Sequence, residues 1–536
     1  VFAGSAAPGS SPAGAAFVSL VLDQLDTPFT RARVARGGLA ITTTLDYDLQ
    51  QDISCALRGA SDCPAASAPA LSGPAAALVL DPQTGQVLAA EARGLPLATP
   101  HDPGTLLAPF VYLTAFTRGF GPASLVWDIP PAGSNALEAA AYHGPVRMRI
   151  ALANDYAGAA RSVAARMGSD AIRRTEASFG LDRDRATLLE AASAYAALAA
   201  GGVRYGLPGP TAVLRVEGLD HRLWLDLSNP QAQPVVTPAL AYLLNSVLSD
   251  DSARWPSFGH PNDLEIGRPL GVKLGASADG ADAWAIGYTP ARLVGLWLGA
   301  SSPAEAQPAA ASPAPDPRPS LLASLLRRAV ASLPSGGWPA PQGVTSMVVC
   351  DPSGLLPTRD CPTTVTEVFL SGNEPAQPDT LFHTYAVNRE TGFLATVFTP
   401  PELVQDRVFM ALPPEAQPWA RLVDVPVAPS SYDAIQAPPP DPYVHITSPA
   451  VFAEVSGAVQ FRGTASGADF ERYRLLAGQG LNPQSWVVLA DSPTRVEDGL
   501  LAAWDTAGLN GLYAVELQVI RTDQRIDTAI MQVTVK

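Results

Sequence analysis

The sequence predicts an α+β domain built on an antiparallel sheet, followed by a smaller β-sandwich. Two apolar segments flank Asp81-Pro82-Gln83-Thr84-Gly85, whose proline and glycine favour a hairpin turn. Three more strand-like segments follow one another closely later in the chain, and helical patterns lie between the two groups. After residue 441, apolar and polar residues alternate, as in half-buried strands. The expected strands of the first domain span 76–80, 86–90, 270–275, 283–288 and 293–298.

Local patterns justify the other elements in order. A β-branched run predicts a strand at 39–46, and Asp46 is a suitable N-cap for the helix that follows it. An alanine- and leucine-rich helix should end at Gly201-Gly202, since glycine favours helix ends. Helices are expected at 17–25, 47–57, 111–117, 144–168, 186–200, 238–249 and 320–333.

These patterns predict four regions. The N-terminal region is a linker or pedestal, and the main α+β domain carries a Pro/Ala/Ser-rich loop at 302–319. An irregular Pro-rich segment with a cysteine pair follows, and Pro438-Pro439-Pro440 ends a stiff linker. Short strands separated by turns then predict an immunoglobulin-like β-sandwich. The expected boundaries are 1–73, 74–340, 341–435 and 441–536.

Composition excludes several classes of function. The net charge of −15 disfavours binding to nucleic acid or to an anionic membrane surface. No apolar run is long enough to predict a transmembrane segment. Nearly all of the basic residues are arginine, and the two lysines are Lys273 and Lys536, so few amines are available as a general base. No zinc-protease motif, serine elbow or phosphate loop occurs, and neither a cofactor nor a metal is predicted.

The four cysteines form two pairs that are close in sequence. This spacing predicts the disulfides Cys55–Cys63 and Cys350–Cys361 and therefore an oxidising compartment, with the protein secreted to an extracellular or cell-surface location. Four buried thiols are an alternative. A four-cysteine zinc site is another, although neither pair has the spacing of a zinc ribbon.

Motifs through most of the chain resemble the transpeptidase half of class A penicillin-binding proteins. Each is weak alone, and their order and spacing carry the resemblance, which implies a β-lactamase/D,D-transpeptidase-like fold. A small cysteine-bearing segment and a C-terminal β-domain of that family also have counterparts here. The matching stretches are Arg36–Leu39 with Thr42–Asp46, Gly104 with Pro109-Phe110-Val111-Tyr112, Ala151 to Asn154, Lys273 and Gly275, Asp282-Ala283-Trp284, Gly287 to Pro290, Cys350 to Cys361, and Trp504-Asp505 with Leu509 to Tyr513.

The departures from the family lie on its catalytic positions. Ser-x-x-Lys corresponds to Thr105–Ala108, Ser-x-Asn to Asp155–Ala157, and Lys-Thr-Gly-Thr/Ser to Lys273–Ala276. A hydroxyl nucleophile needs a base, and alanine at position 108 has none. We therefore expect no catalytic residues. The degenerate motif positions are Thr105, Ala108, Asp155, Ala157, Lys273, Leu274, Gly275 and Ala276.

Asp155 and Lys273 suggest a more specific hypothesis. If Lys273 keeps its family position, its ammonium faces the second motif and needs a counter-charge, which the Asp155 carboxylate can supply. The alternative is that both side chains point into solvent.

The resemblance and its departures together predict a pseudoenzyme. The expected role is a scaffold subunit that binds other protein subunits in an extracellular or cell-envelope assembly, with peptidoglycan as a further possible partner. Two alternatives are an envelope protein that binds peptidoglycan stem peptide or β-lactam without acylation, and a weak D,D-transpeptidase that acts through Thr105.

Overall fold

The computed structural model describes residues 14–58, 71, 73–206, 209–300, 316–433 and 439–536. The chain divides into two compact units, one comprising Val1–Thr380 with Pro413–Asp424 and the other Leu381–Leu412 with Val425–Lys536. Each unit has its own hydrophobic core.

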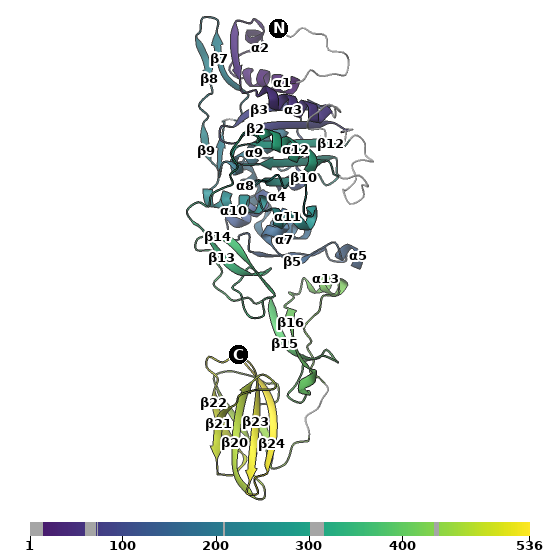
Figure 1. The fold of residues 1–536 in the computed structure, drawn as a ribbon, viewed down its shortest axis with the longest axis vertical. Coiled ribbons are helices and arrows are strands. Elements are labelled where there is room, and N and C mark those ends of the chain that lie inside the picture. The colour runs from purple at the N-terminus through teal and green to yellow at the C-terminus, as the bar shows by residue number, and fades with distance from the viewer. Residues whose placement is uncertain (1–13, 59–70, 72, 207–208, 301–315, 434–438) are drawn as a thin grey trace. The chain divides into compact units, whose positions relative to one another are not determined.

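A five-stranded antiparallel sheet organises the first unit (Figure 1). Its strand order is β10-β11-β12-β2-β3, so the predicted hairpin and the predicted run of three strands lie in one sheet. β10 is an edge strand, which leaves one side of its backbone available to neighbouring segments. The strands are β2 (Ala75–Asp81), β3 (Gln86–Arg93), β10 (Gly271–Ala276), β11 (Asp282–Tyr288) and β12 (Leu293–Gly299).

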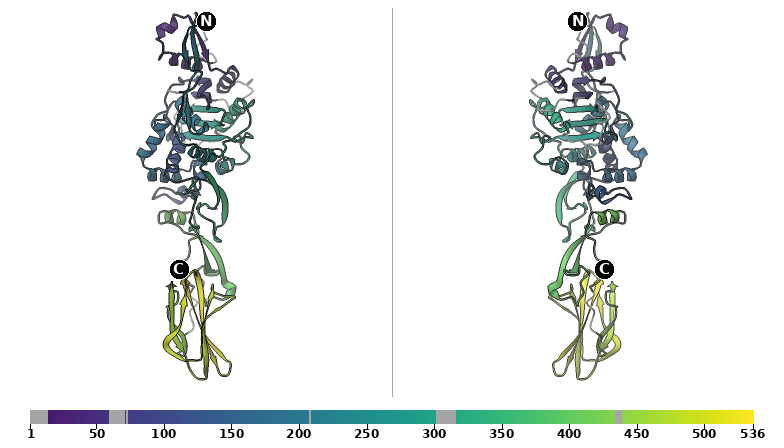
Figure 2. Two further views of the ribbon diagram at one scale, coloured as in Figure 1. Left: turned by 90° about the vertical axis from the view of Figure 1, so that its left-hand side faces the viewer. Right: turned by 90° about the vertical axis from the view of Figure 1, so that its right-hand side faces the viewer.

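The sheet is buried on both faces, which explains the nearly continuous apolar sequence of β2. Ala76, Leu78 and Leu80 belong to one core, with helices α4 (Ala108–Phe116), α9 (Leu188–Ala199) and α10 (Pro238–Leu248). The alternate residues of β2 belong to the other core, with α3 (Tyr47–Arg58) and α12 (Arg318–Ala329). Figure 2 shows the helices on both sides of the sheet.

The N-terminal region contains α1 (Ala15–Leu25), α2 (Arg31–Ala35) and β1 (Leu39–Thr43). β1 pairs with β7 (Val213–Gly218), and β8 (Leu223–Asp226) completes a three-stranded sheet. Asp46 Oδ1 accepts hydrogen bonds from the backbone N–H groups of Asp48 and Leu49 at 3.1 and 3.2 Å, which confirms the predicted helix cap.

Smaller elements complete this unit. Most predicted helices are present, but the stretch expected to be helical at 144–168 begins as a strand, because Gly144–Arg147 pairs with Leu125–Asp128. The remaining elements are β4 (Leu125–Asp128), α5 (Ala136–Ala139), β5 (Gly144–Arg147), α6 (Met148–Ala153), α7 (Ala157–Met167), α8 (Ser169–Ser178), β6 (Val203–Tyr205), β9 (Ala232–Pro234), α11 (Asp251–Phe258) and α13 (Gln417–Leu422).

The segment 341–435 is more regular than its sequence predicts. It forms two antiparallel hairpins, and the division between the two units falls inside it. The expectation of irregular structure is wrong because the prolines lie outside the four strands and leave their backbone N–H groups free to pair. The hairpins pair β13 (Val344–Asp351) with β14 (Thr363–Leu370), and β15 (Phe382–Asn388) with β16 (Val404–Met410).

The disulfide Cys350–Cys361 is present, with 5.8 Å between the two Cα atoms, and confirms one predicted pair. Cys55 is also disulfide-bonded, but Cys63 lies outside the described residues, so the second pair stays a prediction. Most of the expected loop at 302–319 also lies outside them, and its last residues instead begin α12 at Arg318.

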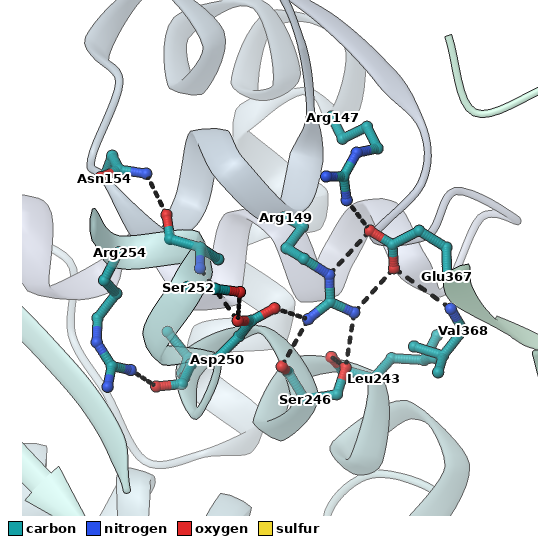
Figure 3. A network of polar contacts seen from close by, with 12 residues as sticks. Arg147, Arg149, Asn154, Leu243, Ser246, Asp250, Ser252, Arg254, Glu367 and Val368 are labelled. Carbon is teal, nitrogen blue, oxygen red and sulfur yellow. Dashed lines mark hydrogen bonds and ion pairs between the residues drawn. The ribbon is translucent and has the colours of Figure 1, made fainter. Parts of the chain in front are cut away.

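A buried charge network attaches the β13–β14 hairpin to the rest of the first unit. Glu367 on β14 is fully buried, and its carboxylate binds the guanidinium groups of Arg147 and Arg149 (Figure 3). Arg149 is held in turn by the Ser246 carbonyl at 2.7 Å and by Asp250 at 3.1 Å. A buried carboxylate with two cationic partners fixes the position of this hairpin.

The second unit contains two further sheets that share one core. Their strand orders are β17-β19-β22 and β18-β24-β23-β20-β21. The predicted alternation is present, since Tyr513, Val515, Leu517 and Val519 are buried. The immunoglobulin-like topology stays a prediction, and the linker expected before residue 441 lies mostly outside the described residues. The strands are β17 (Val444–Ser448), β18 (Glu454–Val455), β19 (Ala458–Ala465), β20 (Phe470–Gln479), β21 (Val487–Ser492), β22 (Val496–Asp505), β23 (Gly511–Arg521) and β24 (Ile526–Val535).

Candidate functional site

The first motif, Thr105–Ala108, lies in a short 3-10 helix, η1 (Gly104–Leu107), and in the first residue of α4, which follows directly. Gly104 has φ +48°, and a Cβ at this residue would lie 1.9 Å from the Ala276 carbonyl oxygen. Glycine is therefore needed both for the backbone conformation and for the close approach of η1 to β10. The Trp284 indole donates to the Asp102 carbonyl at 2.8 Å and holds the segment before η1.

A histidine also supports this entry segment. The ring of His101 stacks on that of Trp297, with 3.7 Å between centroids, and His101 Nδ1 lies 3.1 Å from Asp282 Oδ1. Burial lowers the pKa of His101, and the Asp282 carboxylate opposes that effect. The neutral imidazole is thus the form that the surroundings favour.

The Thr105 hydroxyl lies against the edge of β10. Its oxygen accepts a hydrogen bond from the Ala276 backbone N–H at 3.1 Å, and this is its one hydrogen bond in the part of the chain that the structure describes. Thr105 is exposed, and Ala108 begins α4 with no polar side-chain atom. The hydroxyl is therefore positioned by a backbone amide and not by a base.

Asp155 and Lys273 form the ion pair predicted from the sequence. Lys273 Nζ contacts Asp155 Oδ2 and the carbonyl oxygen of Leu274. The Lys273 side chain is 3% exposed, whereas that of Asp155 is 34% exposed. Burial lowers the pKa of the Lys273 ammonium, and its contact with Asp155 opposes that shift.

Asp155 adopts an uncommon backbone conformation. Its φ of +55° lies in the left-handed region, which residues other than glycine seldom adopt. Ala157 follows it as the first residue of α7 and offers no hydrogen-bonding side chain. Of the residues at the second motif position, only Asp155 therefore contributes a functional group toward Lys273.

Arg318 belongs to this site and was missed in the sequence, where it falls in the expected loop 302–319. Its Nη1 atom donates to the carbonyls of Gly275 at 2.6 Å and Trp284 at 3.0 Å. A Cβ on Gly275 would lie 2.5 Å from the Leu106 backbone nitrogen, so glycine is again required by close packing. The Arg318 guanidinium thus hydrogen-bonds to the backbone carbonyl of Gly275, which lies between Leu274 and Ala276.

One further tyrosine lies near these groups. The Tyr112 hydroxyl on α4 is buried, and among the described residues it has no hydrogen-bond partner. Burial raises the pKa of Tyr112, and the Asp155 carboxylate adds to that effect. Tyr112 therefore stays protonated and does not act as a base. The described residues also include no cluster of three or more potential metal ligands.

Comparison of the sequence with known proteins finds similarity to penicillin-binding proteins. Residues 340–384 match the family model "Penicillin-binding protein 1A, C-terminal domain", a stretch that includes the β13–β14 hairpin and the disulfide. Penicillin-binding protein 1C of Escherichia coli is 28% identical over 287 residues, which are 51% of this chain and 36% of that protein. Penicillin-binding protein 1A of Clostridium perfringens is 24% identical over 410 residues, which are 64% of this chain and 47% of that protein.

A solved structure, the penicillin-binding protein PonA1 from Mycobacterium tuberculosis, has the same fold. It superposes with a TM-score of 0.52 at 19% identity and covers 62% of this chain and 95% of that one. The chain is thus similar to class A penicillin-binding proteins in sequence and has the fold of one of them. This penicillin-binding protein homologue spans about a third to a half of the length of the relatives from E. coli and C. perfringens.

The similarity to these proteins corrects the predicted location. The expectation of a secreted, extracellular or cell-surface protein is wrong, because the relatives are class A penicillin-binding proteins, which are membrane-anchored and periplasmic. Among the residues that the structure describes, no helix is both long and apolar enough to span a bilayer.

Proposed function

We propose that this chain is a non-catalytic penicillin-binding protein homologue that acts as a structural subunit of a cell-envelope assembly. The observation that carries the proposal is the surroundings of the Thr105 hydroxyl. Its partner among the described residues is the Ala276 backbone N–H, and residue 108 has no proton acceptor.

Acyl transfer by an alcohol requires a base that removes its proton. Such a base lies within about 3 Å of the hydroxyl, directly or through one water. Groups that act as one catalytic unit lose most of the rate when any one is removed, on the order of 10⁶-fold in a serine protease. Alanine at 108 and at 157 removes two such groups here, which supports a site without acyl-transfer activity.

Lys273 is a poor substitute for the missing base. Its ammonium already contacts the Asp155 carboxylate and the Leu274 carbonyl. Accepting a proton from Thr105 would first require the lysine to lose its own proton and with it the ion pair. Asp155 stabilises the charged amine, and this opposes such a reaction.

The retained architecture supports a binding or structural role. The main sheet, the close contact of η1 with β10 and the buried attachment of the β13–β14 hairpin are all intact. A fold that keeps its packing while its polar motif positions change is more simply explained by partner binding than by chemistry.

Covalent labelling with a fluorescent penicillin tests the proposal. We expect no labelled band for the wild-type chain or for Thr105→Val, with penicillin-binding protein 1C of E. coli as the positive control. A covalent label that is lost in Thr105→Val would show acyl transfer and refute the proposal. Reversible retention of the penicillin, measured by fluorescence polarisation, would instead favour ligand binding without acylation.

Native purification tests the structural role. The chain is isolated from its own cells after mild cross-linking, and the mass of the complex is measured. We expect co-purification with one or more envelope proteins in fixed stoichiometry. Recovery of the chain alone across cross-linker concentrations would contradict a scaffold role.

A further inference from the structure

Strand β21 leaves an open edge on the second unit. It lies at one end of the sheet β18-β24-β23-β20-β21, where it pairs with β20 (Figure 1). Within the described ranges, no further strand pairs with its other edge. Such an edge exposes backbone N–H and C=O groups, and these groups select an extended chain as the partner.

The sequence of β21 is apolar where an edge strand is usually protected. The stretch Trp486–Ala490 is an unbroken apolar run that contains no charged residue and no proline. Leu489 and Ala490 pack against the core of the second unit, whereas Val487 and Val488 are 65% and 56% exposed. Edge strands that stay unpaired commonly carry a charge or a proline at such positions. The run is therefore held in place by the core and still presents two large apolar side chains to a partner.

The other edges of the two sheets in this unit are protected. β18 has two residues, which is too short to guide a further strand. The pairing of β22 with β19 is irregular at two places, and Glu497 and Asp498 add exposed negative charge to β22. β17 also has an irregular register with β19, and Pro449 follows it directly. These devices disfavour pairing at the other edges and leave β21 as the edge suited to it.

The charge at the end of β21 is neutralised within the same chain. Asp491 Oδ1 accepts a hydrogen bond from Arg472 Nε at 2.8 Å, and Asp491 Oδ2 accepts one from Arg474 Nε at 2.9 Å. Two guanidinium groups thus share one carboxylate, so this part of the surface carries no excess of negative charge. A molecule with the same net charge of −15 therefore meets little local repulsion at β21.

From these features we propose that β21 pairs antiparallel with β21 of a second copy of this chain, with a two-fold axis at Val488. A two-fold contact uses the same surface on both copies, so it closes as a dimer and does not extend into a filament. The pairing does not depend on the chemistry at Thr105.

The register about Val488 makes the strand complementary to itself. β21 pairs regularly with β20 at Val488, and its bulge falls at Leu489. With the two-fold axis at Val488, the apolar run Trp486–Ala490 lies opposite the same run of the second copy. Asp491 lies opposite Ser485, so no two like charges face each other along the strand. This self-complementarity favours a second copy over a strand of unrelated sequence.

Sedimentation velocity of the full chain from about 1 to about 200 µM tests the dimer. We expect a shift from monomer to dimer across this range. Val488→Lys and Val488→Glu each place like charges opposite each other at the axis and should weaken self-association at least about tenfold. The matched control Val408→Lys changes a valine of β16 that is 50% exposed and should leave self-association unchanged.

An equimolar mixture of Val488→Lys and Val488→Glu tests the two-fold axis itself. Each variant alone should be largely monomeric, whereas the mixture should form dimers, because the lysine of one chain then faces the glutamate of the other. Val488→Cys provides an independent measurement. Residues opposite each other across an antiparallel pair have Cα atoms about 4.5–5.5 Å apart, within reach of a disulfide. We expect a disulfide-linked dimer under mild oxidation for Val488→Cys and none for Val408→Cys.

Circular dichroism and thermal unfolding establish that each variant is folded. Three results would overturn the proposal: a wild-type chain that stays monomeric throughout the concentration range, equal self-association by wild type and Val488→Lys, or a mixture of the two charged variants that does not form dimers. Penicillin labelling reports on Thr105 and these measurements report on β21, so either proposal can fail while the other holds.

Discussion

The buried carboxylate of Glu367 provides the sharpest test of how the first unit is held together. Its two oxygens bind two guanidinium groups, with Arg149 Nε and Nη2 each at 2.8 Å. Glu367 is 0% exposed and the side chains of Arg147 and Arg149 are 8% and 10% exposed, so water cannot replace the lost charge easily. Removing one partner of a buried pair costs about 3–5 kcal/mol.

Glu367→Ala should lie at the lower end of that range, about 3 kcal/mol, because both arginines keep other partners. Arg147 retains Asp351 at 2.7 Å, and Arg149 retains Asp250 and the Ser246 carbonyl. Glu367→Gln keeps the shape and one acceptor but loses the charge, so its cost should be about 1.5–3 kcal/mol, as for a hydrogen bond to a charged group.

Hydrogen–deuterium exchange with peptide resolution measures the effect locally, and urea unfolding measures the free energy of unfolding. We expect exchange in β13 and β14 to accelerate by about a hundredfold in Glu367→Ala, since 3 kcal/mol corresponds to roughly that factor. The control is Glu415→Ala, which changes an exposed glutamate of the same unit. The reasoning would be refuted if Glu367→Ala left the exchange rates of β13 and β14 unchanged and its free energy of unfolding within 0.5 kcal/mol of the wild-type value.

Three other predictions follow from the site. Gly104→Ala should lower the free energy of unfolding of the first unit by about 3 kcal/mol in urea unfolding, because its Cβ would clash with a carbonyl oxygen of β10. The control Gly133→Ala changes a residue that also has a positive φ but has no atom within contact distance, so it should cost less. Equal costs for the two variants would contradict this prediction. Asp155→Asn keeps an acceptor but leaves the buried Lys273 ammonium without its counter-charge, so it should cost about 1.5–3 kcal/mol, as for a hydrogen bond to a charged group. Lys273→Met in the same background should recover part of this cost, and no recovery would count against the ion pair. Burial lowers the folded-state pKa of His101, so the unfolded chain binds the proton more tightly, and the free energy of unfolding should fall as the pH decreases below about 6.5. His101→Phe should reduce the dependence of the free energy of unfolding on pH in this range. An unchanged pH dependence in His101→Phe would argue against burial of the neutral ring.

Much of the main domain could be predicted because its signals are local. The turn at Asp81–Gly85 and the cap at Asp46 depend on a few adjacent residues, and both elements are present. The pair between Asp155 and Lys273 could be predicted from motif order together with the cost of an unpaired buried charge.

Other features depend on contacts between distant segments and have no local signal. Glu367 lies in the middle of a strand, where a glutamate is expected to be exposed. It is buried because Arg147 and Arg149, 220 and 218 positions earlier in the chain, bind its carboxylate. Arg318 follows a Pro/Ala-rich stretch that is typical of solvated loops, and its contacts with the sheet give no pattern along the chain. Regular strands between the prolines of 341–435 were hidden by composition averaged over the whole segment.

The close contact between η1 and β10 has a consequence for mutational drift. Gly104 and Gly275 are fixed by space, since any side chain would collide with backbone atoms. Thr105 is exposed and Ala108 is only partly buried, so neither residue is fixed in this way. Selection for folding alone would therefore preserve the frame around a reaction centre long after the reacting groups had changed, and a serine and a lysine reintroduced there would enter a frame that is already formed.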